Sequence, residues 1–352
     1  MTSEASAPST EAGYEHAVFA PGRVNLIGDH TDHAGGLALP MAVQLGTTLR
    51  YRREGDRVEL TSDAEPVPAS VPIDVDDPSR VRPSWARYVA GVVAEVRPKV
   101  GLRGELRTTL PLGGGLSSSA ALEVAVAIAL GAPRDPLTVA RLCQRAEHRG
   151  PQVPCGLMDQ LTCTAGVEGA ALLIDFTLCT WTPVPLPDTL AVHVVHCGVP
   201  RQLDGSAYAD RADECKRAAD QIGPLAIASL AGVHRLPDSV MRRRARHVVS
   251  ENMRVRAMVD ALRASDLTAA GALLVESHRS LRDDFEVSIP ALDDLVERLC
   301  ATPGVFGARL TGAGFGGCVV AFADAQADLS AFGGWRMHAS AGARVIPTQA
   351  GS

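Results

Sequence analysis

The chain is poor in lysine: its 352 residues include only two, Lys99 and Lys216, and neither follows a glycine. The common phosphate-binding loop G-x-x-x-x-G-K-[ST] needs a lysine directly after a glycine, so that loop is excluded. If nucleotide phosphates bind to this chain, backbone amides, serine hydroxyls and a metal ion must hold them.

Long apolar runs are also missing. No stretch is long enough to cross a bilayer, so we expect no membrane partner. Residues 1–16 (MTSEASAPSTEAGYEH) are polar and carry acids where a signal peptide has positive charge followed by an apolar core. These features predict a disordered leader at residues 1–16 and a cytoplasmic protein.

Paired cysteines and basic stripes are equally scarce. The eight cysteines form no C-x-x-C pair, which argues against a zinc site and a disulfide framework and predicts buried free thiols. The net charge is −6, and the one basic run is RRRAR at residues 242–246. Because that run precedes a helical pattern, we interpret it as a solvated face and exclude nucleic acid as a partner.

The length of the chain exceeds that of one typical core and predicts two domains. The composition turns proline-rich at residues 182–188 (TPVPLPD), which places the boundary there and divides the chain into residues 17–185 and 186–352. The mixture of hairpins and helices favours an α+β fold over a doubly wound α/β sheet.

Hydrophobic periodicity predicts the individual elements. Residues 46–53 and 57–62 are expected to pair as strands around a turn, and Ser84 is expected to cap a helix whose apolar stripe faces the core. The stripe consists of Trp85, Tyr88, Val89, Val92 and Val96. Further strands are expected at residues 17–20, 104–110, 169–176, 190–196, 305–310 and 318–322, and helices at 122–130, 136–148, 207–222, 239–263, 267–281 and 291–300.

Three segments carry candidate chemistry. Residues 111–123 (PLGGGLSSSAALE) join a strand to a helix, and their glycines and serines suit an anion at a helix N-terminus. Residues 21–39 (PGRVNLIGDHTDHAGGLAL) place carboxylates beside imidazoles, as a sugar site needs, because sugar hydroxyls both donate and accept hydrogen bonds. Asp159 and Glu147 could flank one site for phosphoryl transfer, with one acid on Mg²⁺ and the other orienting a hydroxyl.

Together these segments resemble a known enzyme family. Residues 21–36 resemble the galactokinase signature, residues 111–123 the ATP-binding motif of the GHMP kinase superfamily, and TGAGFGGC at residues 311–318 its third motif. Four further segments also resemble galactokinases, and all seven matches occur in the family's order: CGLMDQ, SAYADRADEC, RRARHVVSEN and SHRSLRDDFEVS, at residues 155–160, 206–215, 243–252 and 277–288.

The resemblance implies a two-domain GHMP kinase fold, with an N-terminal ribosomal-protein-S5-like domain that binds ATP and sugar, and a ferredoxin-like C-terminal domain. It implies an ATP-dependent kinase of galactose metabolism that phosphorylates the C1 hydroxyl of galactose, uses Mg²⁺ and is a monomer. Asp159 would be the catalytic carboxylate and Arg23 its partner, with Ser119 and Glu147 holding Mg²⁺. The ATP phosphates would contact Gly113, Gly114, Gly115, Leu116, Ser117, Ser118 and Ser119, and the sugar Asp29, His30, Asp32, Gly156 and Tyr208.

Two positions depart from the family signature. Asp29 replaces the usual glutamate, and His33 with Ala34 replaces a common Tyr-Asn pair. The resemblance implies that the family's glutamate lies near the sugar's C6 hydroxyl, and the missing methylene would withdraw the Asp29 carboxylate from that hydroxyl. The alternatives are therefore a kinase for arabinose, a uronic acid or another galactose-configured hexose, or a sensor that binds ATP and sugar without turnover. A mevalonate- or homoserine-type kinase would leave the GDHTD sequence at residues 28–32 unexplained.

Overall fold

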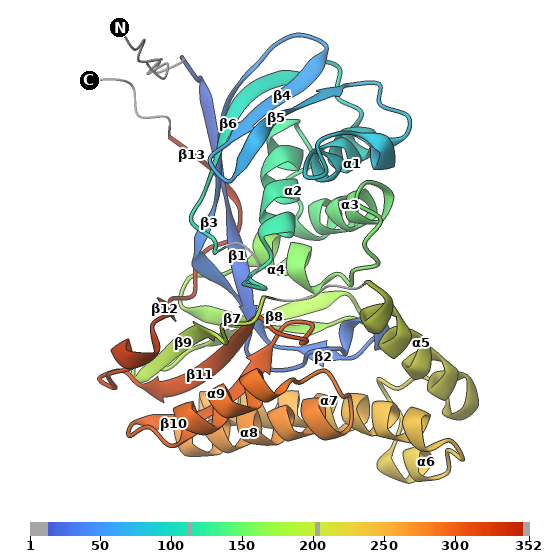
Figure 1. Cartoon of the computed structure of the whole chain (residues 1–352), viewed down its shortest axis with the longest axis vertical. Helices are drawn as coiled ribbons and strands as arrows, with labels where there is room; N and C mark the ends of the chain where they lie inside the picture. The colour runs from blue at the N-terminus through green and yellow to red at the C-terminus, as the bar shows by residue number, and fades with distance from the viewer. Residues whose placement is uncertain (1–12, 112–113, 201–204, 348–352) are drawn as a thin grey trace, which may run out of the picture.

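The computed structural model describes residues 13–111, 114–200 and 205–347, with the side chains of residues 205–208 left undescribed. The chain forms an elongated molecule of two lobes joined at a waist (Figure 1). Most of the predicted leader lies outside the described residues. Within them, no helix is long and apolar enough to cross a membrane.

The upper lobe is built on a six-stranded sheet with the order β13-β1-β3-β6-β4-β5. Its strands are β1 (His16–Asn25), β3 (Pro40–Arg53), β4 (Arg57–Ser62), β5 (Glu65–Pro72), β6 (Leu102–Thr108) and β13 (Arg344–Ile346). Strand β13, near the end of the chain, pairs with β1, so the last described segment returns to the sheet on which the first one lies.

The predicted pairing of residues 46–53 with 57–62 is wrong. Strand β6 lies between β3 and β4, antiparallel to β3 and parallel to β4. The chain reaches that central position only after β5 and a helix, so the pairing depends on a long crossover. A short turn between two runs of β-forming residues is typical of a hairpin. Those residues give no sign that a strand from later in the chain lies between them.

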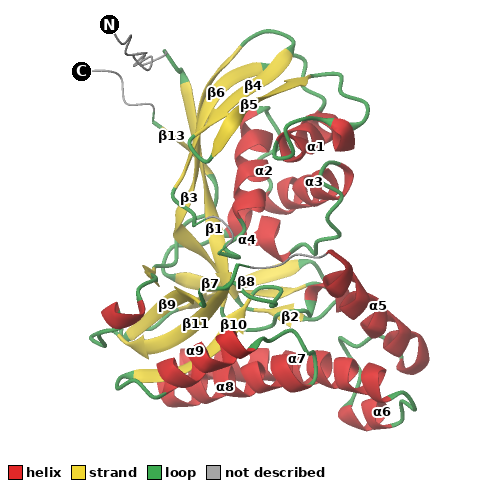
Figure 2. Cartoon of the chain, in the orientation of Figure 1, coloured by secondary structure: helices red, strands yellow, loops and turns green. Residues whose placement is uncertain are grey.

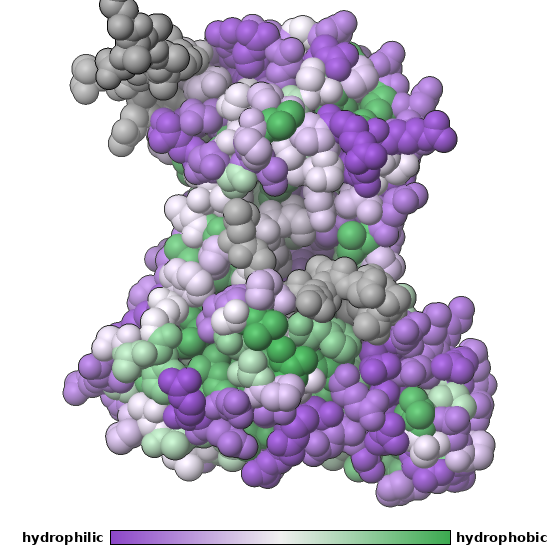
Figure 3. Space-filling view, viewed as in Figure 1, coloured by the Kyte–Doolittle hydropathy of each residue, from purple (hydrophilic) through white to green (hydrophobic). Residues whose placement is uncertain are grey.

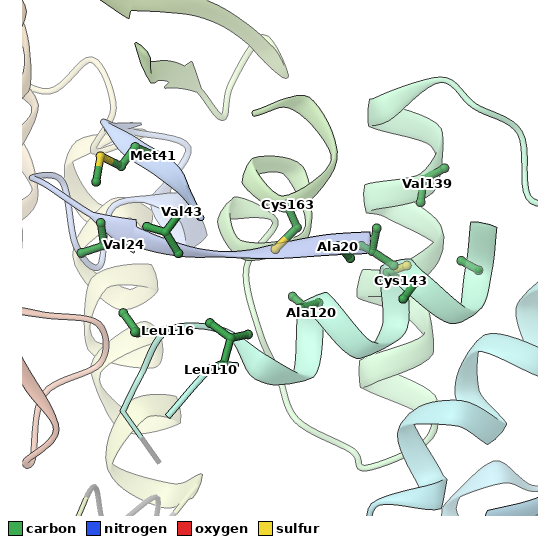
Figure 4. Packing of buried hydrophobic residues seen from close by; sticks show 14 of the residues in the cluster. Ala20, Val24, Met41, Val43, Leu110, Leu116, Ala120, Val139, Cys143 and Cys163 are labelled. Carbon is green, nitrogen blue, oxygen red and sulfur yellow. The ribbon is translucent and has the colours of Figure 1, made fainter. Parts of the chain in front are cut away.

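The helices of the upper lobe lie on one face of this sheet (Figure 2). They are α1 (Ala86–Val96), α2 (Ser118–Ala129), α3 (Pro136–Arg149) and α4 (Met158–Ala165). Helix α2 is apolar around most of its circumference because it packs against β1, β3 and all three other helices. Figure 4 shows part of the resulting core, in which Val24 and Val43 of the sheet share one cluster with Ala120 of α2 and Cys163 of α4.

The first of these helices differs from the prediction at its start. Trp85, not Ser84, occupies the N-cap position, and no side chain caps the helix. The indole Nε1 of Trp85 instead donates to the carbonyl oxygen of Val67 at 2.9 Å, so packing against β5 sets the start of α1. Trp85, Val89 and Val92 are buried as predicted, while Tyr88 is half-buried.

The lower lobe contains a four-stranded sheet with the order β10-β11-β9-β12, covered by long helices. Its strands are β9 (Leu190–His196), β10 (Val305–Thr311), β11 (Cys318–Asp324) and β12 (Trp335–Met337), and its helices are α5 (Gly205–Ile222), α6 (Leu230–His234), α7 (Ser239–Arg263), α8 (Leu267–Asp283) and α9 (Pro290–Cys300). The predictions for β9 and α7 match residue by residue. The predicted α+β class is confirmed.

A small sheet of β2 (Leu37–Ala38), β7 (Ala170–Asp175) and β8 (Thr180–Pro185) completes the fold, with the order β2-β7-β8. Part of the proline-rich segment is therefore strand β8, which among the described strands pairs with β7 alone. Pro183 and Pro185 are tolerated there because an edge strand leaves one side of its backbone unpaired. The domain boundary that we placed in this segment stays a prediction.

The cysteines and the arginine run complete the comparison with the sequence. All eight cysteines are free, and four of them are buried: Cys143, Cys163, Cys215 and Cys318. The solvated face predicted for residues 242–246 is wrong at Arg244, which is 1% exposed. Its guanidinium binds Glu214 at 2.7 Å and Glu286 at 2.5 Å. Both acids come from other parts of the chain, so the local run of charge could not reveal them.

Candidate active site

A pocket of about 310 Å³ at the waist gathers the predicted site residues, which come from distant segments. Those that line it are Arg23, Asp29, His30, Asp32, Gly115, Leu116, Ser117, Ser118, Ser119, Glu147, Gly156 and Asp159. Gly114 is not among the lining residues. Gly113 and the side chain of Tyr208 lie outside the described part of the chain. Most of the site predicted from the sequence is thus brought together in space.

An arginine–aspartate pair forms the centre of the pocket. Arg23 of β1 donates from Nε to Oδ1 of Asp159 at 2.7 Å and from Nη2 to Oδ2 at 2.8 Å. A third donor, Nη1, binds the carbonyl oxygen of Gly115 at 2.5 Å. Burial alone would lower the pKa of Arg23, but Asp159 raises it, so the guanidinium stays charged. This two-point contact fixes the plane of the carboxylate.

The aspartate remains accessible from the pocket although its partner is buried. Its side chain is 28% exposed, against 5% for Arg23. Asp159 lies in the first turn of α4, where the free N–H groups of the helix favour a negative charge. Ser117 Oγ donates to Oδ2 at 2.5 Å. The carboxylate is therefore held by two side chains while one part of it faces the space that a substrate would occupy.

The glycine–serine loop leads into the start of α2, which lies at the waist in Figure 1. The helix begins at Ser118, earlier than the predicted residue 122. Gly115 and Ser117 both have positive φ, which turns the chain sharply before the helix. Ser118 and Ser119 then occupy the first turn, where backbone N–H groups have no partner within the helix. This geometry suits an anion.

A buried acidic cluster lies behind the serines. Glu147 of α3 accepts hydrogen bonds at Oε2 from Gln160 Nε2 at 2.6 Å and from Cys155 Sγ at 3.2 Å. Burial raises the pKa of Glu147, and the hydroxyl of Ser119 is near enough to oppose that shift. Glu147 and Ser119 therefore lie together at the pocket wall, where each offers an oxygen to a cation.

The donors present fit Mg²⁺. No group of three or more His, Cys, Asp or Glu side chains in the described part of the chain could hold a metal ion alone. Mg²⁺ commonly takes one or two protein oxygens and completes its shell with water and substrate phosphates. The Glu147 carboxylate and the Ser119 hydroxyl, next to an anion-binding helix terminus, supply that kind of partial set.

The opposite wall carries the polar loop that contains Asp29 and Asp32. Arg309 Nη2 donates to Oδ2 of Asp29, and the backbone N–H of Gly312 donates to Oδ1 at 3.2 Å. Asp32 lies at the start of a short 3-10 helix (Asp32–Ala34) and its carboxylate abuts Gly156 so closely that a Cβ there would clash. Burial and the nearby Asp159 raise the pKa of Asp32 to about 6.

The sequence analysis missed Tyr88, which lines the pocket, and Arg309, which binds the lining residue Asp29. Tyr88 lines the pocket although its helical spacing assigned it to the core. Tyr88 is half-buried, and helical spacing alone does not distinguish a half-buried residue of an apolar stripe from a fully buried one. Arg309 was also missed, because an isolated arginine before a glycine-rich turn gives no sign of a buried partner.

The chain matches three described protein families. Residues 9–53 match the galactokinase galactose-binding signature, residues 87–167 the GHMP kinases N terminal domain, and residues 258–333 the GHMP kinases C terminal. The chain is 44% identical over 333 residues to a galactokinase of Homo sapiens and 43% identical over 340 residues to one of Bos taurus. Each alignment covers 89% of this chain and 85% of the relative.

The comparison with solved structures agrees with these sequence comparisons. A crystal structure of Lactococcus lactis galactokinase complexed with galactose superposes with a TM-score of 0.86 at 30% sequence identity, covering 94% of each chain. The predicted GHMP kinase fold with N- and C-terminal domains is thereby confirmed.

Proposed function

The chain belongs to the galactokinase family of the GHMP kinase superfamily, and we propose that it transfers the γ-phosphoryl group of ATP to the C1 hydroxyl of galactose. The prediction of a kinase that phosphorylates galactose with ATP is confirmed. The C1 position, the use of Mg²⁺ and the role of each residue are part of the proposal. These parts of the proposal rest on one observation. Arg23 binds the Asp159 carboxylate in a pocket that the start of α2 and the polar loop also line.

In the proposed mechanism, Asp159 accepts a hydrogen bond from the C1 hydroxyl and takes its proton as the new P–O bond forms, while the bond between the γ-phosphorus and the bridging oxygen breaks and ADP leaves. Arg23 and Ser117 fix the carboxylate in one orientation, which reduces the cost of aligning the hydroxyl with the phosphorus atom. The fixed positive charge of Arg23 also stabilises negative charge that develops beside Asp159 during transfer.

The ATP phosphates are proposed to lie at residues 113–119 and to bind the first-turn N–H groups of α2 and the hydroxyls of Ser118 and Ser119, two residues that line the pocket. Mg²⁺, held by Glu147 and Ser119, would neutralise phosphate charge. Without a P-loop lysine, the backbone and the bound cation must together balance that charge.

We expect Glu147→Gln to raise the Mg²⁺ concentration needed for half-maximal activity by about 10- to 100-fold, because an amide is a weaker ligand than a carboxylate. A Mg²⁺ titration at saturating ATP and galactose measures the shift. Glu95→Gln is a matched control, since Glu95 is a mostly buried acid paired with Arg145 and Arg149 on the outside of α1 and α3. An unchanged Mg²⁺ requirement in Glu147→Gln would remove Glu147 from the metal site.

Galactose is proposed to contact Asp29, His30, Asp32, Gly156 and Tyr208, the first four of which line the pocket. The shorter side chain of Asp29 does not leave a loose carboxylate, because Arg309 and the Gly312 amide each bind one oxygen. We propose that Asp29 acts on the sugar from this fixed position, while Asp32 accepts hydrogen bonds from sugar hydroxyls.

The raised pKa of Asp32, about 6, predicts a pH dependence. Above that pKa the carboxylate accepts hydrogen bonds, and below it the group is protonated and loses part of that capacity. kcat/KM for galactose should therefore fall as the pH drops below about 6, since this ratio reports groups of the free enzyme. Asp32→Asn should have a lower kcat/KM than the wild type, and its kcat/KM should not show this fall with pH. A wild-type profile that stays flat from pH 8 to pH 5 would contradict the assignment.

The proposed function is tested by ADP release in a coupled assay with Mg-ATP and a panel of sugars. We expect release with galactose and none with 1-deoxygalactose, which lacks the accepting hydroxyl. Binding of galactose without ADP release would instead favour the sensor. A cytoplasmic location and a monomeric state stay predictions, and light scattering of the purified protein tests the second.

A further inference from the structure

The loop proposed to bind galactose is held in place by the other half of the chain. Residues 25–37 carry Asp29, His30 and Asp32, and their backbone groups bind side chains from α7 and β10. The contacts are Thr311 Oγ1 to Asn25 O at 2.8 Å, Arg309 Nη1 to Leu26 O at 2.9 Å, Glu251 Oε1 to Gly28 N at 3.0 Å, His247 Nε2 to Asp29 O at 3.1 Å, and Asn252 Oδ1 to Leu37 N at 2.8 Å. None of these five side chains lines the pocket.

Glu251 is the most constrained of the five. Its side chain is fully buried, and Oε1 accepts from the Gly28 N–H and from Ser277 Oγ, the latter at 2.6 Å. Arg254 Nε donates to Oε2 at 2.7 Å. Burial would raise the pKa of Glu251, but Arg254, His247 and Arg309 outweigh it and lower the pKa to about 2. The acceptor for Gly28 is therefore a carboxylate across the working pH range.

The backbone of the loop leaves little freedom at these contacts. Gly28 has φ +95°, and a Cβ there would lie 2.5 Å from Leu37 O and 3.0 Å from Val255 Cγ2 of α7. Gly36 is similarly close to Asn252, whose Oδ1 would lie 2.5 Å from an added Cβ. Glu251 and Asn252 thus bind the backbone of the loop at Gly28 and at Leu37, one on each side of Asp29 and Asp32.

The sequence segment that supplies these residues, RRARHVVSEN at residues 243–252, has no role in the mechanism described above. We propose that Glu251 and Asn252 are positioning residues for galactose: they fix the backbone of residues 28–37, and through it the side chains that contact the sugar, without contacting the sugar themselves. This inference rests on the proposed function, since it requires that residues 29–32 bind galactose.

The first test uses steady-state kinetics with each substrate varied in turn. We expect Glu251→Ala to raise KM for galactose about tenfold, because a small displacement of binding groups has a large effect, and to leave KM for ATP within about twofold. Glu251→Gln should recover most of the galactose KM, since Gln Oε1 still accepts from the Gly28 N–H. Glu95→Ala, which removes a partner from two arginines far from the loop, should change neither KM.

Asn252→Ala provides a second variant that removes no buried charge, should Glu251→Ala fail to fold. We expect it to raise KM for galactose several-fold and to leave KM for ATP unchanged. Reduced kcat with both KM values at the wild-type level, in Glu251→Ala or Asn252→Ala, would mean that these residues act only on stability and would overturn the inference.

Asp32→Asn separates this inference from the proposed function. If Asp32→Asn raises KM for galactose while Glu251→Ala and Asn252→Ala do not, the loop binds the sugar but α7 does not position it. If none of the three changes KM for galactose, the sugar assignment of the loop itself is wrong, and the inference fails with it.

Discussion

Replacing Asp159 with Asn will lower kcat by about 10²- to 10⁴-fold, the usual effect of removing a general base, while ATP still binds. An asparagine has nearly the same shape and can still meet Arg23 through its oxygen, but it cannot take the proton of the sugar hydroxyl. The second oxygen, which now binds Arg23 Nη2 and Ser117 Oγ, becomes an NH₂ group. The substitution should therefore lower kcat while ATP still binds.

Steady-state assays that detect ADP measure kcat, and calorimetry with a non-hydrolysable ATP analogue measures nucleotide binding. Asp294→Asn, an equivalent change at an exposed position on α9, controls for nonspecific effects. Turnover of Asp159→Asn within about threefold of wild type would reject the catalytic role, because a general base typically contributes about 10²- to 10⁴-fold.

Replacing Arg23 with Met will lower kcat by about 10²- to 10³-fold, the range found when a preorganised donor is removed from a transition state. Methionine fills a similar volume but removes both Arg23 donors from the Asp159 carboxylate and the one from the Gly115 carbonyl, which leaves Ser117 as a donor to Asp159. Because the side chain is only 5% exposed, water cannot replace those hydrogen bonds well, so the melting temperature should fall too.

Arg23→Lys distinguishes charge from geometry at this position. Lysine keeps the positive charge but lacks the planar fork that binds both oxygens of Asp159 and the Gly115 carbonyl together. We expect kcat of Arg23→Lys to exceed that of Arg23→Met by no more than about tenfold. Arg145→Met, at an exposed arginine paired with Glu95, controls for the loss of a guanidinium. Wild-type turnover in Arg23→Lys would contradict the role of the two-point contact.

The sequence predicted best those features that depend on residues close together in the chain. The glycines and serines of residues 114–119 turn the chain and begin a helix within a few residues. Their place between a predicted strand and a predicted helix is what indicated an anion site there. The ranges of α7 and β9 follow from periodicity in the same way, because each buries one continuous face. The pairing of Arg23 with Asp159 is different. It spans 136 residues, and the resemblance to a family, not the spacing, predicted it.

What the sequence could not predict depends on long-range partners. Arg309 meets Asp29 across 280 residues, and Glu251 meets Gly28 across 223. A buried charge has no periodic signal of its own, because its stability depends on a partner that any distant segment can supply. The misplaced pairing of β3 with β4 has the same origin, since β6 enters between them from later in the chain.

The space-filling view is consistent with a site at the waist. The outer surfaces of both lobes are largely hydrophilic, and apolar residues gather on the lower lobe just below the waist (Figure 3). The pocket draws Gly312 and Ala313 from that lobe and Ser118 and Glu147 from the upper one. Substrates bound there would contact both halves of the chain, as transfer between two substrates requires.

The most direct test of the account is the structure of the product. Purified protein should be incubated with Mg-ATP and galactose, and the phosphorylated sugar identified by ³¹P and ¹H NMR, with Asp159→Asn in parallel. We predict a single product in which phosphorus couples to the anomeric proton, formed by the wild type and nearly absent with Asp159→Asn. Phosphate on any other carbon, or equal product from both proteins, would contradict it.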